Sequence, residues 1–241
     1  MYSLIKPLRD RLNKLAYRLK IKKPTKVYFV SGMCYKCSVY DGIKLPTGFE
    51  KIYLEWFAPT SANESLNEYA RRMAAGIDTK RPFILIGYSL GGVIIQEMNS
   101  FVSPVKNIVI SSMTSENEIP ALFKVAKRGH LANLVPDSIF EATEFIVNIF
   151  SKTVYKMSAE LLDGYMICTD PMYVKWGVQQ ITNWQPRYQC LRLYHIHGSE
   201  DQIFPAKQIE DAYIVEEADH LMVLTHSKEV NAIIDEILSK K

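Results

Sequence analysis

The sequence RPFILIGYSLGGVIIQE, residues 81–97, decides the fold of this chain. Its apolar run from Phe83 to Ile86 predicts a buried strand, and the residues after Gly91 have the pattern of a helix. The turn between them, Gly87-Tyr88-Ser89-Leu90-Gly91, has the form G-x-S-x-G. On a sharp strand-to-helix turn, such a serine adopts strained backbone geometry with its hydroxyl above the sheet edge. The two glycines are expected because strand and helix approach too closely there for a Cβ atom, and the helix N-terminus adds partial positive charge. We interpret Ser89 as a nucleophile.

Length and composition predict one globular unit. The chain has 241 residues, of which 48% are hydrophobic and 23% charged, which is typical of a folded domain. It has no apolar run near the ~20 residues that a transmembrane helix needs, and its first residues lack the features of a signal peptide. Four cysteines are too few for a disulfide scaffold and favour a reducing, cytoplasmic setting: Cys34, Cys37, Cys168 and Cys190.

The N-terminal segment, residues 1–25, is distinct from the body. Leucines spaced by three and four predict an amphipathic helix over 3–20. Residues 1–26 carry nine basic side chains against one acidic side chain, Asp10. Two interpretations stay open: a helix packed on the body with a solvated basic face, or peripheral contact with anionic lipid.

Strands and helices alternate through the rest of the chain. Strand patterns occur at 26–30, 51–56, 83–87, 107–111, 191–197 and 212–215. A helix capped by Ser61 is expected from about 63 to 77, and a final amphipathic helix over 227–238. This order predicts an α/β fold with a mainly parallel open sheet covered by helices on both faces. Residues 26–111 and 188–241 form the expected core, and 112–187 a helical cap insertion.

Two further residues complete a catalytic set with Ser89. A serine needs a base to take its proton, and the base needs an orienting acid. Asp201 lies in the loop after the strand at 191–197, and His220 follows the strand at 212–215, so both are expected at the carboxyl edge of the sheet. The order Ser89, Asp201, His220 is that of the hydrolase form of the triad.

These pieces resemble the α/β-hydrolase superfamily. The matching motifs are Ile86 to Gly92, His197-Gly198 through Asp201-x-x-x-Pro205, and His220 with the apolar residues after it. The resemblance implies the α/β-hydrolase fold with a short N-terminal sheet edge. It implies Ser89 as nucleophile, His220 as general base and Asp201 as orienting carboxylate. It also implies an oxyanion hole made by the backbone N–H groups of Leu90 and Met33.

Two departures from the family pattern affect the site. Ser31-Gly32 stands where many relatives have His-Gly, which changes the hydrogen bonding of the first loop. Asp219 precedes the histidine where many relatives have glycine, and it could raise the pKa of His220 or compete with Asp201.

Other chemistry-bearing residues have simpler explanations. Glu200 could replace Asp201, but the spacing to Pro205 favours Asp201. The remaining histidines have no metal-ligand spacing and are interpreted as surface or structural residues: His130, His195, His197 and His226. Cys34-x-x-Cys37 has no second ligand pair for zinc, so two loop thiols or a redox effect on the neighbouring loop remain open.

The cap insertion is rich in flexible and aromatic apolar side chains, which suit an adaptable hydrophobic pocket but also plain core packing. The candidate substrate residues are Met157, Leu161, Tyr165, Met172 and Trp176. We expect a serine hydrolase that cleaves a carboxylic ester or thioester with an apolar part, without metal or cofactor and with no nucleic-acid partner. Peptidase, lactonase, C–C hydrolase or acyltransferase chemistry, or a non-catalytic binding role, remain alternatives.

Overall fold

The protein is built on a six-stranded parallel sheet. The computed structural model describes residues 23–119, 164–165, 171–188 and 190–240. The strand order is β2-β1-β3-β4-β5-β6, and each neighbouring pair is parallel. The strands are β1 (Thr25–Val30), β2 (Phe49–Leu54), β3 (Phe83–Tyr88), β4 (Lys106–Ile110), β5 (Leu193–Gly198) and β6 (Ala212–Val215).

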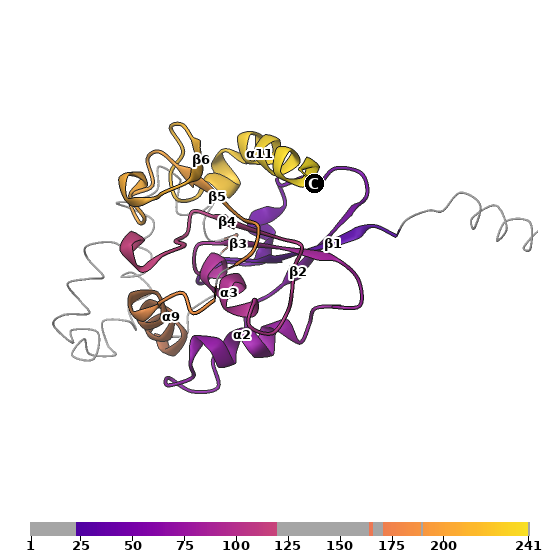
Figure 1. Ribbon diagram of the computed structural model, residues 1–241. Coiled ribbons are helices and arrows are strands. Elements are labelled where there is room, and N and C mark those ends of the chain that lie inside the picture. Colours follow the sequence, from indigo (N-terminus) through magenta and orange to yellow (C-terminus); the bar gives the residue numbers. More distant parts are fainter. Residues whose placement is uncertain (1–22, 120–163, 166–170, 189, 241) are drawn as a thin grey trace, which may run out of the picture.

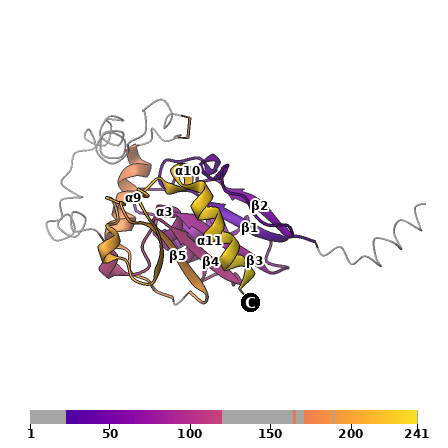
Figure 2. The ribbon, with the colours of Figure 1, turned by 90° about the horizontal axis from the view of Figure 1, so that it is seen from above.

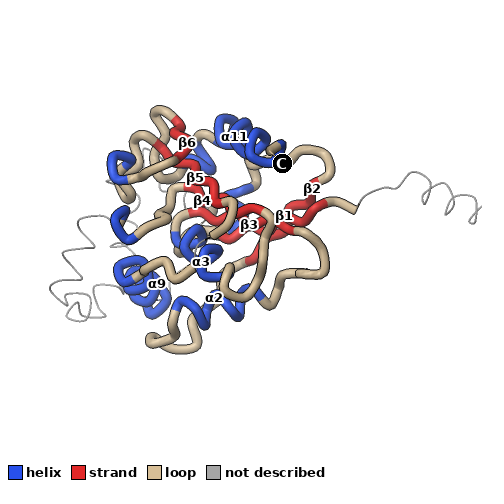
Figure 3. Tube along the Cα trace, in the orientation of Figure 1, coloured by secondary structure: helices blue, strands red, loops and turns tan. Residues whose placement is uncertain are grey.

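Helices cover both faces of this sheet (Figure 1). On one face lie α2 (Leu66–Ala74), α3 (Leu90–Met98) and α9 (Pro171–Asn183), which share one hydrophobic core with the sheet. On the other lie the short helix η1 (Cys37–Tyr40), α10 (Met222–Thr225) and α11 (Ser227–Ser239), around a second core. Figure 2 shows α11 running across the strands, and Figure 3 shows the strands between the two helical layers. Two short 3₁₀ turns, η2 (Glu116–Glu118) and η4 (Ala206–Gln208), lie in the loops after β4 and β5.

The expected fold class is confirmed, since the strands follow the apolar runs of the sequence and the sheet is parallel. β3 and β4 are buried along their whole length, as parallel central strands must be. The second strand is Phe49–Leu54 and therefore begins two residues before the stretch predicted for it.

The start of the first long helix differs from its prediction. Helix α2 begins at Leu66 because Ser65, not Ser61, caps it. The Ser65 hydroxyl accepts the Glu68 N–H, and the Glu68 carboxylate accepts the Ser65 N–H. These two reciprocal bonds form a capping box.

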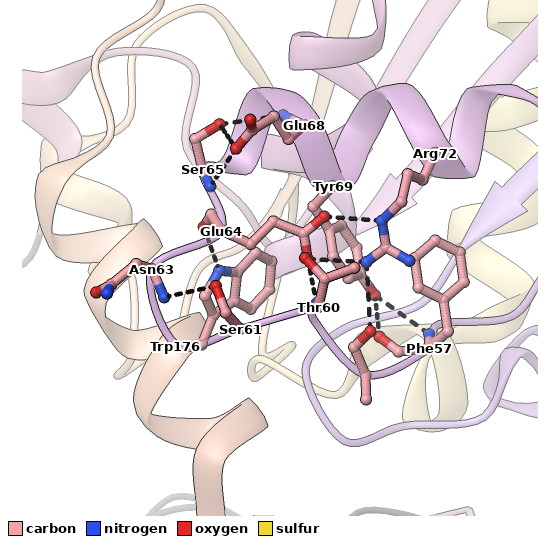
Figure 4. A network of polar contacts seen from close by, with 11 residues as sticks. Phe57, Thr60, Ser61, Asn63, Glu64, Ser65, Glu68, Tyr69, Arg72 and Trp176 are labelled. Atoms are coloured by element: carbon pink, nitrogen blue, oxygen red, sulfur yellow. Dashed lines mark hydrogen bonds and ion pairs between the residues drawn. The ribbon is translucent and has the colours of Figure 1, made fainter.

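The residues before α2 are held by a polar network that also binds α9 (Figure 4). The Glu64 carboxylate accepts hydrogen bonds from Arg72 Nε at 2.7 Å and from the Thr60 N–H at 2.6 Å. The Glu64 carbonyl accepts the indole N–H of Trp176 at 2.7 Å. The ring of Trp176 packs on Tyr69, with ring centroids 4.5 Å apart. This network fixes α9 against the α2 side of the sheet.

Two predicted segments lie wholly or partly outside the described residues. The basic helix expected over 3–20 lies outside them, as does most of the insertion predicted over 112–187. In the described part of that insertion, the long element is helix α9 and no strand occurs. Among the described helices, none is long and apolar enough to cross a membrane.

Candidate active site

Ser89 occupies a strained turn between β3 and α3. Its backbone angles are φ 52° and ψ −123°, a conformation that is costly for a residue with a Cβ atom. The Ser89 N–H donates to the Ile110 carbonyl at 2.9 Å, and the Ser89 carbonyl accepts the Ser112 hydroxyl at 2.7 Å. Hydrogen bonds from β4 and the loop after it therefore hold the turn in place.

Gly87 and Gly91 are required by close backbone contact. A Cβ atom on Gly87 would lie 2.3 Å from the Gly91 carbonyl oxygen. One on Gly91 would lie 2.3 Å from the carbonyl oxygen of Val30 and 2.5 Å from that of Ser31. The turn thus packs directly against the end of β1, which brings the loop after β1 beside the serine.

The structure brings Ser89, His220 and Asp201 into one hydrogen-bonded chain. Ser89 Oγ lies 3.0 Å from His220 Nε2, and His220 Nδ1 lies 2.8 Å from Asp201 Oδ2. All three side chains are buried, Ser89 being 7% exposed. They follow β3, β6 and β5, so the three loops meet at the carboxyl edge of the sheet, as the sequence order predicts.

Asp201 is held as a carboxylate. Burial alone would raise its pKa, but the facing His220 imidazole, with smaller contributions from His197 and the Phe204 N–H, outweighs burial and lowers it below the usual range. Its Oδ1 atom accepts the N–H groups of Ile203 at 2.8 Å and Phe204 at 2.9 Å. The other oxygen, Oδ2, is left to face the imidazole of His220.

An ionised Asp201 determines which nitrogen of His220 carries the proton. A carboxylate only accepts hydrogen bonds, so His220 Nδ1 carries hydrogen and donates to Asp201. His220 Nε2 is then free to accept the proton of the Ser89 hydroxyl. This arrangement can transfer a proton from serine to histidine as the serine oxygen attacks an electrophilic carbon.

Asp219 does not compete for His220. Its Oδ1 atom accepts the Leu221 N–H at 2.9 Å, and burial raises its pKa. The imidazole Nδ1 points instead to Asp201. Glu200, the other carboxylate considered from the sequence, is exposed.

The two backbone groups expected to form the oxyanion hole lie on elements beside the serine. Leu90 is the first residue of α3, where N–H groups have no acceptor within the helix. The loop after β1 passes close by, because a Cβ atom on Gly32 would lie 3.1 Å from the Cβ of Ser89. Met33, next in that loop, packs under α9: a Cβ atom on Gly177 would lie 2.6 Å from Met33 Sδ and 3.3 Å from a methyl carbon of Leu90.

Ser31 forms its hydrogen bond within the loop after β1. Its hydroxyl donates to the Tyr35 carbonyl. The Tyr35 N–H in turn donates to the Gly32 carbonyl at 3.2 Å. The loop that carries Met33 is therefore closed on itself by two hydrogen bonds.

The cysteines of the C-x-x-C motif are buried, and neither forms a disulfide. Burial, with the nearby Glu55 carboxylate, raises the pKa of Cys37 to about 12, so its reactive thiolate is scarce at neutral pH. Within the described residues, no three His, Cys, Asp or Glu side chains gather as metal ligands would.

The candidate substrate residues from the predicted cap insertion differ in exposure where the structure describes them. Trp176 is fully buried and bonded to Glu64, so packing alone accounts for it and we leave it out of the substrate site proposed below. Met172 is 36% exposed. Tyr165 is half-buried, and its carbonyl accepts the Lys36 N–H at 2.8 Å, which places it beside the loop of Met33. Met157 and Leu161 lie outside the described residues.

Sequence patterns missed the groups that surround the histidine and the acid. The rings of Tyr88 and Phe204 lie beside His220, with centroids 5.3 Å and 5.6 Å away. His197 lies behind Asp201, at 3.5 Å. The alternating histidines of β5 and the residue before Ser89 were visible in the sequence, but nothing there indicated these contacts. His226 is half-buried and bonds Thr225, away from this chain of residues, and His130 lies outside the described residues.

Comparison with known proteins identifies the family of the chain. A family model described as "Alpha/beta hydrolase family" matches residues 47–233. The chain belongs to this family. The match covers most of the chain, including the positions of Ser89, Asp201 and His220. Among curated proteins, the comparison finds no match.

Solved structures of this α/β-hydrolase fold resemble the chain at low sequence identity. A lipase-esterase related protein from Clostridium acetobutylicum superposes with a TM-score of 0.62 at 14% identity, covering 90% of this chain and 95% of that one. A structure from a study of carboxylesterases of Nitrososphaera gargenis gives 0.65 at 15% identity, with 90% of each chain covered. A thermophilic esterase from Thermogutta terrifontis gives 0.58 at 16% identity and the same coverage. These likenesses show the fold.

Proposed function

We propose that this α/β hydrolase cleaves a carboxylic ester or thioester through an acyl-enzyme on Ser89. The observation that carries the proposal is the hydrogen-bonded chain from Ser89 Oγ through His220 to Asp201. His220 takes the serine proton during attack and returns it to the leaving group. A water activated by His220 then releases the acyl group.

The other parts of the proposed mechanism are electrostatic. The carbonyl oxygen of the substrate becomes negative during attack and would be bound by the N–H groups of Leu90 and Met33. Removing one such donor typically costs about 10²–10³-fold in rate. The N-terminus of α3 adds partial positive charge at the same place.

The apolar part of the substrate is assigned to the cap side of the serine. Met172 and Tyr165 come from the cap insertion, and Met33 and Leu90 are apolar residues that contact its helix α9. Met157 and Leu161 belong to the same proposed site by sequence. The ester-cleaving activity named for the T. terrifontis structure agrees with this choice of substrate.

A panel of substrates tests the proposal and separates ester from thioester. Initial rates are measured on p-nitrophenyl acetate, butyrate and octanoate, and on acyl thioesters through release of the thiol. The Ser89→Ala variant is expected to lose about 10⁶-fold in kcat. Ser103→Ala, which changes an exposed serine, is the matched control and should retain full activity. Hydrolysis that survives in Ser89→Ala would contradict the proposed nucleophile.

Location and partners are separate proposals. Three buried or half-buried cysteines that form no disulfide agree with a reducing, cytoplasmic setting: Cys34, Cys37 and Cys190. Cell fractionation tests this setting, and recovery of the protein from an oxidising compartment would contradict it. Peripheral membrane contact through the basic residues 1–25 is proposed as an addition to that setting. The expected partner of the site is a small-molecule substrate rather than a nucleic acid.

A further inference from the structure

Two buried histidines on β5 have no part in the mechanism above. His195 and His197 are 3% and 0% exposed, and they are two residues apart, so both side chains lie on the same face of the strand. Buried imidazoles are costly unless they are hydrogen-bonded. Their hydrogen bonds connect them to the loop that carries Asp201.

The hydrogen-bond partners of the two histidines determine which nitrogen of each ring carries hydrogen. His197 Nε2 lies 2.7 Å from the Phe204 carbonyl oxygen, which can only accept, so Nε2 carries the hydrogen. Burial lowers the pKa of both histidines, that of His195 to about 3, so the rings are neutral. His197 Nδ1 is then an acceptor, and His195 Nε2, 3.2 Å away, must donate to it. The chain runs from His195 through His197 to Phe204.

Phe204 closes the turn around the acid. Its N–H and that of Ile203 donate to Asp201 Oδ1. The Phe204 carbonyl and N–H lie in adjacent peptide units of one residue, so a hydrogen bond that holds the carbonyl fixes the residue whose N–H orients the carboxylate. His197 Nε2 also lies 3.5 Å from Asp201 Oδ2, against 2.8 Å for His220 Nδ1. The shorter distance makes His220 the hydrogen-bond partner and leaves His197 behind the acid.

From these contacts we infer that His197, oriented by His195, is a positioning residue that fixes the 201–204 turn so that Asp201 Oδ2 faces His220. The inference rests on the proposed function, since it concerns the acid of that site. It assigns a role to the donor on His197 Nε2 and requires no charge on the ring. His195 contributes by donating to His197 Nδ1, which favours the same tautomer that the Phe204 carbonyl requires.

A matched pair of substitutions separates this role from simple packing. The amide nitrogen of glutamine reaches the place of Nε2, whereas that of asparagine reaches only the place of Nδ1. His197→Gln can therefore still donate to the Phe204 carbonyl, and His197→Asn cannot. We expect His197→Asn to lose about 10²-fold in kcat on p-nitrophenyl acetate with KM little changed, as for a displacement of about 1 Å in a catalytic group. His197→Gln should retain most of the activity.

A spectroscopic readout keeps the test independent of turnover. In protein labelled with ¹⁵N-histidine, the hydrogen on His220 Nδ1 gives a low-field proton resonance, assigned by its loss in His220→Gln. The resonance should persist in His197→Gln and shift or exchange away in His197→Asn. Thermal unfolding and circular dichroism establish that each variant is folded. If His197→Asn is not folded, His195→Leu takes its place, because it leaves every group that touches Asp201 unchanged. The His220 resonance should then shift or exchange in the same way as expected for His197→Asn, but to a smaller extent.

The possible results separate the role of His197, the role of His195 and the proposed function from one another. Equal activity and equal resonances in folded His197→Gln and His197→Asn would overturn the inference, whether both match the wild type or both are impaired. An unchanged resonance in folded His195→Leu would overturn the role of His195. A wild type that neither hydrolyses esters nor reacts at Ser89 would refute the proposed function, and the resonances would still decide whether His197 positions Asp201.

Discussion

Substitution of Gly91 by alanine tests whether close backbone packing holds the serine turn in its working position. The added Cβ atom would lie 2.3 Å from the Val30 carbonyl oxygen, about 1 Å short of the 3.4 Å at which ordinary contact begins. All three obstructing atoms, on Val30 and Ser31, belong to the backbone, so no side chain can move aside. The serine turn and the loop of Met33 must therefore separate by about 1 Å.

A displacement of that size in a catalytic group costs about 10²-fold in rate. Overpacking of this kind also costs about 1–3 kcal/mol in unfolding free energy, or about 2–12 °C in Tm for a chain of this length. Gly76→Ala is the matched control, because its Cβ atom would meet only a Leu54 methyl at 3.3 Å and the Met73 carbonyl at 3.5 Å. The assay is kcat/KM on p-nitrophenyl acetate together with thermal unfolding. A folded Gly91→Ala variant with the activity of Gly76→Ala would refute the reasoning.

Three further predictions concern Asp201, helix α9 and the N-terminus. The pKa of Asp201 is lowered in the folded protein, so its charge stabilises the fold above the unfolded value of about 3.9, and this stability is lost as pH falls through the folded pKa. The free energy of unfolding in urea should therefore fall less below about pH 4 in Asp201→Asn than in the wild type. If the free energy of unfolding falls equally with pH in both proteins, this prediction is wrong. Trp176→Phe leaves the Glu64 carbonyl without its donor and should cost about 1–3 kcal/mol in unfolding free energy, whereas Tyr188→Phe, on an exposed side chain, should be neutral. For membrane contact, the full chain should pellet with vesicles of anionic lipid and a chain beginning at residue 21 should not; equal pelleting would remove that proposal.

The centre of the sheet could be predicted because its strands are buried on both faces and therefore appear as apolar runs. β3 and β4 are buried along their whole length, and their apolar runs, from Phe83 and from Ile108, are visible in the sequence. The convergence of Ser89, Asp201 and His220 could be predicted because the strands are parallel. Parallel strands put their carboxyl ends, and the loops that follow them, at one edge of the sheet.

The start of α2 could not be predicted, because the sequence offers two capping boxes. Both Ser61-x-x-Glu64 and Ser65-x-x-Glu68 fit the pattern S-x-x-E. Which of the two serines caps the helix depends on groups that bind Glu64 from elsewhere in the fold. The Glu64 carboxylate bonds Arg72, and its carbonyl accepts from Trp176, 112 residues away along the chain.

The hydrogen bonds around Asp201 could not be predicted from the sequence either. The spacing of His195 and His197 places both on one face of a strand, but their ordered hydrogen bonds depend on where the Phe204 carbonyl lies. That position is a property of the folded turn around Asp201 and not of any local pattern. Cys37 is similar, because the raised pKa of its thiol follows from its burial between β1 and β2 and not from its C-x-x-C spacing.

The central claim, that Ser89 is a nucleophile activated by His220 and Asp201, is tested most directly by covalent labelling. The protein is treated with a fluorophosphonate, and the adduct is located by mass spectrometry of the intact chain and of its peptides. The account predicts one adduct, on Ser89, that is absent in Ser89→Ala and forms far more slowly in His220→Ala. No adduct on the folded wild type, or one at the same rate without His220, would contradict it.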